Sequence, residues 1–309
     1  MENYILLTGG TGFIGSHLAE RLLEEGNNLI ILKRSFSDTW RIDHLIKEYP
    51  NERLILFNVD GEDLMDIFKN FNIEGIFHLA AAYIKNPSHE DIMTTIRTNI
   101  EFPTELLNLA VNNDVKYFIN TGTFFEYSLK NLPLTEDSEI DSLNFYSTSK
   151  IAFEDILKYY CKEYDISCAT LKLYTPYGPR DDENKIIPYL ILSSLRGEDV
   201  NINNPHNRLD IVHVYDIIDA YLKLKNNILD LEKYESFNVA RDINYSIDEL
   251  YSSIKFNLGL EEERDLKEKE IPMFSDPSKI KKFLGWEPKI NINKGIEITI
   301  NYYKERYHL

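Results

Sequence analysis

The stretch from Leu6 to Leu18 constrains the fold most, because an apolar run ends there in a glycine-rich turn and a helical pattern follows at once. Gly9, Gly12 and Gly15 stand in a G-x-x-G-x-x-G spacing. Such a turn needs glycine where the backbone angles disfavour a Cβ, where a diphosphate approaches the main chain, and where the helix packs tightly on the sheet. The helix N-terminus then offers N–H groups and partial positive charge to phosphates. The stretch therefore predicts a dinucleotide-binding strand–turn–helix unit.

Further along, short apolar runs alternate with amphipathic helical segments. Continuous apolar strands are typical of parallel sheets covered on both faces, and strand–helix alternation predicts right-handed crossovers. The sequence therefore predicts an α/β protein with a Rossmann-like, doubly wound parallel sheet. The expected strands are residues 4–8, 28–32, 54–59, 76–80, 115–120 and 168–173, and the expected helices are residues 12–25, 40–49, 62–71, 89–112 and 146–164.

Regularity weakens after Gly178 and Pro179, so we expect a domain boundary near residue 174. Residues 1–173 are predicted to form an NAD(P)-binding Rossmann domain that also recruits returning segments near 208–240. Residues 174–309 are predicted to form mainly a smaller α/β substrate domain. The charge run 261–270 is expected to be a solvated helix face or loop.

The composition is that of an ordinary globular protein, with 43% hydrophobic and 28% charged residues. The net charge of −17 argues against nucleic acid or an anionic membrane as a partner. No apolar run approaches the ~20 residues of a membrane span and no signal peptide is recognised, so a cytoplasmic protein is expected. The two cysteines make neither a disulfide framework nor a zinc site, and no His/Asp/Glu cluster has metal-ligand spacing.

A Tyr-x-x-x-Lys pair, Tyr146 and Lys150, begins the helical segment 146–164. The spacing of four puts both side chains on one helical face. The ammonium is expected to lower the pKa of the tyrosine, which could then pass a proton to or from a sugar hydroxyl or carbonyl. Thr121 and Thr123 follow a predicted strand, where ligands of doubly wound sheets bind. A hydroxyl there could hydrogen-bond the reacting oxygen, or both threonines could simply end the strand.

Several further motifs follow the glycine turn in a fixed order, and with them the chain resembles, over nearly its whole length, the extended short-chain dehydrogenase/reductases that act on nucleotide sugars. The motifs are Thr8–Gly15, His78-Leu79-Ala80-Ala81, Thr98-Asn99, Tyr146-x-x-x-Lys150, Tyr177–Arg180, Asp210–Val214 and Leu284-Gly285-Trp286-x-Pro288.

The resemblance implies a catalytic trio of Thr123, Tyr146 and Lys150, in which Lys150 also hydrogen-bonds the nicotinamide ribose. It also implies a homodimer, in which the helices at 89–112 and 146–164 pair across a two-fold axis as a four-helix bundle. The cofactor residues that it implies are Gly9, Gly12, Phe13, Ile14 and Gly15 in the diphosphate turn, Asp60 near the adenine, Ala80 and Ala81 along the ribose path, and Pro176 beside the carboxamide.

Two departures from the family pattern bear on the cofactor and the reaction. Where many members carry an acidic residue that binds the adenosine ribose, this chain has Lys33 followed by Arg34. Cations attract a 2′-phosphate that a carboxylate repels, so NADP(H) is preferred and NAD remains possible. Family 4,6-dehydratases resemble one another in an Asp-Glu pair after the active-site threonine. Here Phe124 and Phe125 follow Thr123 and Glu126 is out of phase, which disfavours a dehydratase.

The substrate contacts show a third departure. Thr175 stands where the family often has Asn, and with Gly122-Thr123 this is similar to the 4-keto-hexulose reductases, such as CDP-abequose and CDP-paratose synthases. Arg180 and Arg208 are candidate ligands for the diphosphate of a nucleotide sugar, although either could be a solvated arginine. His78 and His213 lie in strand-like stretches and are expected to be core residues.

The leading hypothesis is an NADPH-dependent reductase of a nucleotide-diphosphate 4-keto-6-deoxy-hexose. Hydride would pass to C4, Tyr146 would donate the proton, and Thr123 would hydrogen-bond the same oxygen. The alternative is a nucleotide-sugar 4-epimerase with tightly bound NAD. A non-catalytic NADPH sensor is a third possibility, which the intact trio opposes. The nucleotide base and the sugar stay open at this point.

Overall fold

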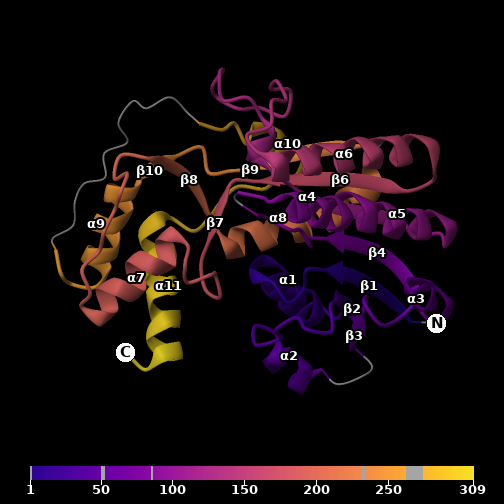
Figure 1. Cartoon of the computed structure of the whole chain (residues 1–309), viewed down its shortest axis with the longest axis horizontal. Helices are drawn as coiled ribbons and strands as arrows, with labels where there is room; N and C mark the ends of the chain where they lie inside the picture. Colours follow the sequence, from indigo (N-terminus) through magenta and orange to yellow (C-terminus); the bar gives the residue numbers. More distant parts are fainter. Residues whose placement is uncertain (1, 50–52, 85, 232–233, 262–273) are drawn as a thin grey trace. The chain divides into compact units, whose positions relative to one another are not determined.

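The computed structural model describes residues 2–49, 53–84, 86–231, 234–261 and 274–309. The chain forms two compact units, each described by itself below (Figure 1). The first unit comprises Met1–Leu129, Glu136–Lys172 and Tyr221–Phe237, and the second comprises Lys130–Thr135, Leu173–Ala220 and Asn238–Leu309. Of the predicted charge run, residues 262–270 lie outside the described residues.

The first unit is built on a seven-stranded sheet in the order β3-β2-β1-β4-β5-β6-β9. The pairs β3–β2, β2–β1, β1–β4 and β4–β5 are parallel, so the predicted Rossmann-like sheet is confirmed. The order reverses between β1 and β4, which is the switch point where such sheets bind ligands. The strands are β1 Asn3–Thr8, β2 Asn28–Lys33, β3 Leu54–Asn58, β4 Asn72–His78, β5 Tyr117–Thr123, β6 Ser167–Leu173 and β9 Glu235–Val239.

Both faces of this sheet are buried, as the continuous apolar strands predicted. In β1, Tyr4 and Leu6 belong to the core cluster that includes side chains of α3, α5 and α6. Ile5 and Leu7 are also buried, and because side chains alternate along a strand they face the opposite layer. The helical elements are α1 Phe13–Glu24, α2 Asp43–Glu48, α3 Leu64–Asn70, α4 His89–Ile96, η1 Arg97–Glu101, α5 Phe102–Asn112, η2 Phe124–Glu126, α6 Phe145–Glu163 and η3 Ile228–Asp230. Helix α8 (Val214–Asn227) is shared, because Val214–Ala220 belong to the second unit.

Three boundaries differ from the prediction in ways that matter for the site. β4 ends at His78, and the next residues turn away to donate N–H groups to Thr8 Oγ1. β5 continues to Thr123, so both candidate threonines belong to the strand itself. The predicted helix 89–112 contains a π-helical segment, η1, between α4 and α5. A π segment inserts one residue into a helix, which the apolar periodicity did not reveal.

The second unit has a three-stranded sheet in the order β10-β8-β7. β8 (Arg208–His213) pairs in parallel with β7 (Thr175–Tyr177) and antiparallel with β10 (Asn244–Ser246). Asp216 braces this unit: its carboxylate accepts N–H groups of Lys289 and Ile290 at 3.0 Å, and its carbonyl accepts the indole N–H of the buried Trp286. The helices here are α7 Ile186–Arg196, α9 Ile247–Asn257, α10 Ser278–Leu284 and α11 Ile292–Tyr307.

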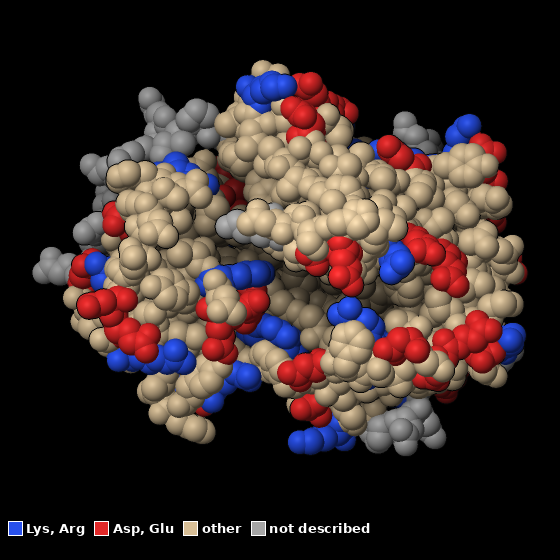
Figure 2. Space-filling view, viewed as in Figure 1, with Lys and Arg blue, Asp and Glu red and all other residues tan. Residues whose placement is uncertain are grey.

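On the face that Figure 2 shows, acidic and basic side chains are interspersed, so the excess negative charge is not gathered into one patch there. None of the helices in the described part of the chain is long and apolar enough to span a membrane.

Candidate active site

A cavity of about 480 Å³ lies in the first unit at the switch point of its sheet. Residues after β1, β2 and β4 form its wall, so it occupies the carboxyl ends of parallel strands, where doubly wound sheets bind ligands. The lining residues are Thr8, Gly9, Thr11, Gly12, Leu32, Lys33, Arg34, Ser37, Val59, Leu79, Ala80, Ala81, Ala82, Arg97, Thr98 and Phe102.

The three glycines of the turn have three different environments. Gly9 has a φ of 71°, the left-handed region that favours glycine. Gly12 lines the cavity, where a bound group can approach its backbone. Gly15 does not line it: a Cβ there would lie 2.1 Å from the carbonyl oxygen of Gly9, so this residue allows helix α1 to close on the turn. The cradle fits the diphosphate of a dinucleotide.

Phe13 and Ile14, which the resemblance placed in the cofactor turn, are likewise absent from the cavity wall. They form the first turn of α1 beyond Gly12. Ala80 and Ala81 do line the cavity, and Thr8 fixes them because its Oγ1 accepts the Ala80 N–H at 3.0 Å.

Lys33 and Arg34 both line the cavity, as a site for a 2′-phosphate requires. The Lys33 ammonium also donates to Asn58 Oδ1 and to the Arg34 carbonyl, each at 3.0 Å. The Arg34 guanidinium lies over the exposed ring of Phe36, and the Arg34 N–H donates to the hydroxyl of Ser37. Ser37 also lines the cavity, so it joins the two cations as a candidate phosphate ligand.

Asp60 lies beside this loop rather than in the cavity wall, where Val59 takes the neighbouring place. Its carboxylate accepts the N–H of Ser35 at 2.8 Å and the Ser35 hydroxyl at 2.8 Å. The hydroxyl bond, followed by the N–H bond, lowers the pKa of Asp60. Contact between Asp60 and an adenine therefore stays a prediction.

Arg97 and Ala82 line the cavity but were missed from the sequence. Arg97 begins η1 and adds a third cation to the wall. The adjacent motif residue Asn99 is buried, exchanges hydrogen bonds with the backbone of Ala82, and donates to Ser149 Oγ on α6. The Thr98-Asn99 motif was the signal that pointed to this segment.

Of the two threonines at the end of β5, Thr121 is already engaged, because its hydroxyl bonds the phenol of the buried Tyr221 at 2.6 Å. Thr123 is nearly buried and caps the short helix η2: its Oγ1 accepts the Phe125 N–H at 3.3 Å. Thr123 therefore ends the strand and caps the next helix, and a catalytic role for its hydroxyl stays a prediction.

Tyr146 and Lys150 lie in the first turns of α6, which packs against β5 and η2. Asn144 fixes the start of this helix, because its side chain accepts the Ser147 N–H at 2.9 Å. The Lys150 ammonium lies 6.0 Å from the centre of the Tyr146 ring. Tyr83 packs edge-on against the same ring at 5.1 Å. The helix therefore holds the pair on one face, as the spacing predicted.

The predicted lowering of the Tyr146 pKa is wrong for this arrangement. Burial raises the pKa of Tyr146, and the charge of Glu126 raises it further. Burial lowers the pKa of Lys150 to about 8. The sequence argument considered the ammonium alone, whereas desolvation disfavours both charged forms. Tyr146 is therefore a neutral phenol near neutral pH, able to donate a proton.

Glu126 supports the expectation that the dehydratase carboxylates are missing. Its side chain is fully buried and pairs with Lys172, whose ammonium lies 2.7 Å from Glu126 Oε2. The other oxygen accepts the Thr123 N–H at 2.8 Å. The positions directly after Thr123 carry the neighbouring rings of Phe124 and Phe125.

Four of the predicted site residues, Thr175, Pro176, Arg180 and Arg208, belong to the second unit. Thr175 and Pro176 pair with Ile211 and Val212 of β8. Arg208 donates to the Asn244 carbonyl at 2.7 Å and pairs with Glu249 at 3.0 Å, so part of its guanidinium is engaged within the unit. Arg180 has a φ of 67° after β7. Their roles toward a substrate stay predictions.

His78 and His213 are fully buried, which confirms the expectation that they are core residues. Burial holds the pKa of His78 well below its usual value, and its Nδ1 lies 2.9 Å from Thr8 Oγ1. Across the described ranges, no group of three or more His, Cys, Asp and Glu side chains could hold a metal ion.

Known proteins are similar to this chain in sequence and in fold. The profile of the "NAD dependent epimerase/dehydratase family" matches residues 5–240. CDP-abequose synthase of Salmonella muenchen is 30% identical over 306 residues, which are 95% of each chain. UDP-glucose 4-epimerase of Lactobacillus helveticus is 25% identical over 308 residues, which are 92% of each chain.

A solved structure of a UDP-glucose 4-epimerase has a similar fold. UDP-glucose 4-epimerase of Thermotoga maritima, solved with UDP-glucose, superposes with a TM-score of 0.82 at 27% identity, covering 98% of this chain and 99% of that one. The match of the family profile to residues 5–240, which include the glycine turn and the Tyr146–Lys150 helix, decides the assignment. The chain belongs to the NAD dependent epimerase/dehydratase family.

Proposed function

We propose that the protein is an NADPH-dependent reductase of a nucleotide-diphosphate 4-keto-6-deoxy-hexose. The observation that carries the proposal is the pair Lys33 and Arg34 in the cavity wall, where a 2′-phosphate would meet two cations. NADPH is typically used as a released reductant, whereas an epimerase must keep its nicotinamide through the cycle. Similarity to CDP-abequose synthase supports a nucleotide sugar as the substrate.

The trio has a defined task in this reaction. When bound, NADPH supplies the hydride that reaches C4 of the sugar. Tyr146 donates its phenolic proton to the oxygen at C4, and its raised pKa keeps it in the donating form. Thr123 hydrogen-bonds the same oxygen, and the Lys150 ammonium stabilises the negative charge that develops on Tyr146 and bonds the nicotinamide ribose. Arg180 and Arg208 are the proposed ligands of the substrate diphosphate.

NADPH oxidation by the purified protein tests the proposal. The substrates are CDP-, dTDP-, GDP- and UDP-linked 4-keto-6-deoxy-hexoses, and NADH is the matched cofactor control. Oxidation of NADPH in preference to NADH with at least one of them is expected. No consumption of NADPH with any of the four would overturn the proposal. In Tyr146→Phe, turnover should fall by about 10²–10⁴-fold while NADPH still binds; unchanged turnover would remove Tyr146 from the mechanism.

A 4-epimerase is the second candidate, because UDP-glucose 4-epimerases match the chain over nearly its full length. It would use the same trio and return the hydride to the opposite face of the sugar. Denaturing the purified protein and measuring the released cofactor separates the two. Stoichiometric NAD favours the epimerase, and cofactor-free protein that binds NADPH favours the reductase. We also propose that the protein is cytoplasmic and forms a homodimer through helices α4, α5 and α6.

A further inference from the structure

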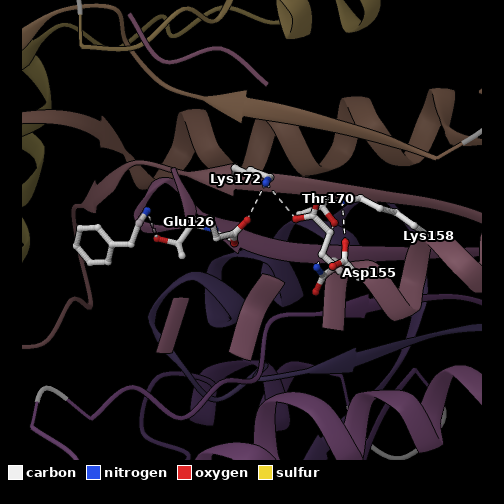
Figure 3. A network of polar contacts seen from close by, with 9 residues as sticks. Glu126, Asp155, Lys158, Thr170 and Lys172 are labelled. Carbon is white, nitrogen blue, oxygen red and sulfur yellow. Dashed lines mark hydrogen bonds and ion pairs between the residues drawn. The ribbon is translucent and has the colours of Figure 1, made fainter. Parts of the chain in front are cut away.

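A network of charged side chains joins η2, α6 and β6 in the first unit (Figure 3). The ammonium of Lys172 on β6 lies 2.7 Å from Glu126 Oε2 and 3.1 Å from Glu154 Oε2. All three side chains are at most 4% exposed. Glu154 also pairs with Lys158 at 3.0 Å, and Lys158, which is 45% exposed, pairs with Asp155 at 3.3 Å, so the network reaches the surface at Lys158.

The ion pair with Lys172 alone gives no account of Glu126. A buried ion pair seldom stabilises a fold more than apolar residues of the same volume, because desolvation offsets the Coulomb attraction. Glu154 divides its carboxylate between Lys172 and the more exposed Lys158, and Glu126 brings a second carboxylate to the Lys172 ammonium. Burial raises the pKa of Glu126 to about 7, which expresses the cost of holding this charge in the interior.

Glu126 has a direct connection to the site. Its Oε1 accepts the backbone N–H of Thr123 at 2.8 Å and so fixes the residue that carries the proposed substrate-binding hydroxyl. Gly122 leaves room for this return, since a Cβ there would lie 2.9 Å from Glu126 Oε1. The other carboxylate oxygen leads through Lys172 to Glu154, which follows Lys150 by one turn of α6. The network therefore joins the two elements that carry the trio.

We propose that Glu126 is a positioning residue, which fixes the backbone at Thr123 and holds a negative charge beside the Tyr146–Lys150 pair. The inference rests on the reductase function proposed above. It needs Glu126 in its ionised form, which the ammonium of Lys172 favours.

The effects of the Glu126 charge on the pKa values of Lys150 and Tyr146 agree with this role. The charge of Glu126 raises the pKa of Lys150 against the lowering by burial, and it raises the pKa of Tyr146. It thus keeps the lysine charged and the tyrosine protonated. The titratable and charged groups around Glu126 are Tyr146, Lys150 and Glu154 from α6, Lys172 from β6 and Tyr234 from the segment before β9, with Lys158 beyond Glu154.

Glu126→Gln and Glu154→Gln form a matched pair of variants. Each removes one carboxylate from Lys172, but only Glu126 bonds Thr123 and acts on the Lys150 charge. In Glu126→Gln, the alkaline limb of the pH profile of NADPH oxidation should move to lower pH, and in Glu154→Gln it should stay in place. An equal shift in both variants, or none in Glu126→Gln, would overturn the charge role.

Glu126→Ala tests the backbone contact. It should lower kcat by about tenfold or more with little change in the KM for NADPH, because the hydroxyl of Thr123 is displaced rather than the cofactor site. Glu126→Gln retains an acceptor for the Thr123 N–H and should keep most of kcat. Thermal unfolding of each variant establishes that it is folded at the assay temperature.

Hydrogen exchange separates this inference from the proposed function. The Thr123 amide should exchange at least about tenfold faster in Glu126→Ala than in Glu126→Gln, with no substrate present. Equal rates in the two variants would remove the positioning role even if the enzyme is a reductase. Faster exchange together with no NADPH oxidation by the unmodified protein would instead count against the reductase.

Discussion

At the scale of single residues, Gly15 shows how little space the cofactor turn leaves. A Cβ at this position would meet the Gly9 carbonyl oxygen at 2.1 Å and Gly10 Cα at 2.9 Å, both backbone atoms that cannot rotate away. Gly15→Ala should therefore separate α1 from the turn, destabilise the protein by about 3 kcal/mol and weaken NADPH binding at least about tenfold. Thermal unfolding and fluorescence titration with NADPH measure the two effects.

Gly61→Ala is the control for that substitution, because nothing lies within 4 Å of a Cβ at Gly61. It should leave both the unfolding temperature and the NADPH affinity close to those of the unmodified protein. If Gly15→Ala behaved like Gly61→Ala, the close packing of turn and helix would not be required for binding.

Lys150 sets the expected pH dependence of the reaction. Its pKa is lowered to about 8 by burial, so the side chain is charged below that pH and neutral above it. The proposed role requires the ammonium, and kcat/KM for NADPH oxidation should therefore fall as the pH rises through about 8. Rates measured from about pH 6 to about pH 10 at constant ionic strength test this. A profile that stays flat to about pH 10 would contradict it.

At the scale of elements, Lys172 joins β6 to α6 and η2 through its two carboxylate partners. Lys172→Met leaves Glu126 and Glu154 buried without their shared cation and should destabilise the protein by about 3–5 kcal/mol. The triple variant Glu126→Gln, Lys172→Met, Glu154→Gln carries no charge at these three positions and should therefore recover most of the lost stability. Chemical denaturation measures both, and a single variant as stable as the unmodified protein would show that the cation is dispensable.

The elements also show what sequence reasoning can and cannot reach. The strands around β1 were predictable because both faces of the sheet are buried and each strand reads as an apolar run. η1 was not, since a π segment leaves the apolar pattern on both sides intact. Among the cavity residues, Gly9, Gly12, Ala80 and Ala81 followed from motifs. Ser37 and Arg97 depend on loop conformation and on contacts between distant segments, which local patterns do not encode. The Thr123–Glu126 bond, by contrast, spans three residues as a capping box, a local pattern that could have predicted it.

At the scale of the whole molecule, we expect two copies of the chain to associate as a homodimer through a four-helix bundle. Tyr159 on α6, a helix of the proposed four-helix bundle, is 56% exposed, so its ring is available for contact with a second copy. If α6 pairs with its copy, Tyr159→Glu should weaken the dimer by about 2–3 kcal/mol, or roughly 100-fold in Kd. Analytical ultracentrifugation across a concentration series measures this.

Leu260→Glu is the matched control, since Leu260 is 61% exposed and belongs to the second unit. It should leave the association constant unchanged. A chain that is monomeric at all concentrations, or a Tyr159→Glu variant that associates as tightly as the unmodified protein, would contradict the proposed bundle.

The π-helical segment Arg97–Glu101 limits which mutations this chain can accept during evolution. Losing a single residue there would restore regular α-helical hydrogen bonding and leave both flanks of the helix nearly in place, because the wider π turn absorbs the extra residue, but the positions within the segment itself would shift. Arg97 would leave the cavity wall or Asn99 would leave Ala82 and Ser149. We expect this segment to tolerate substitutions far better than insertions or deletions of residues.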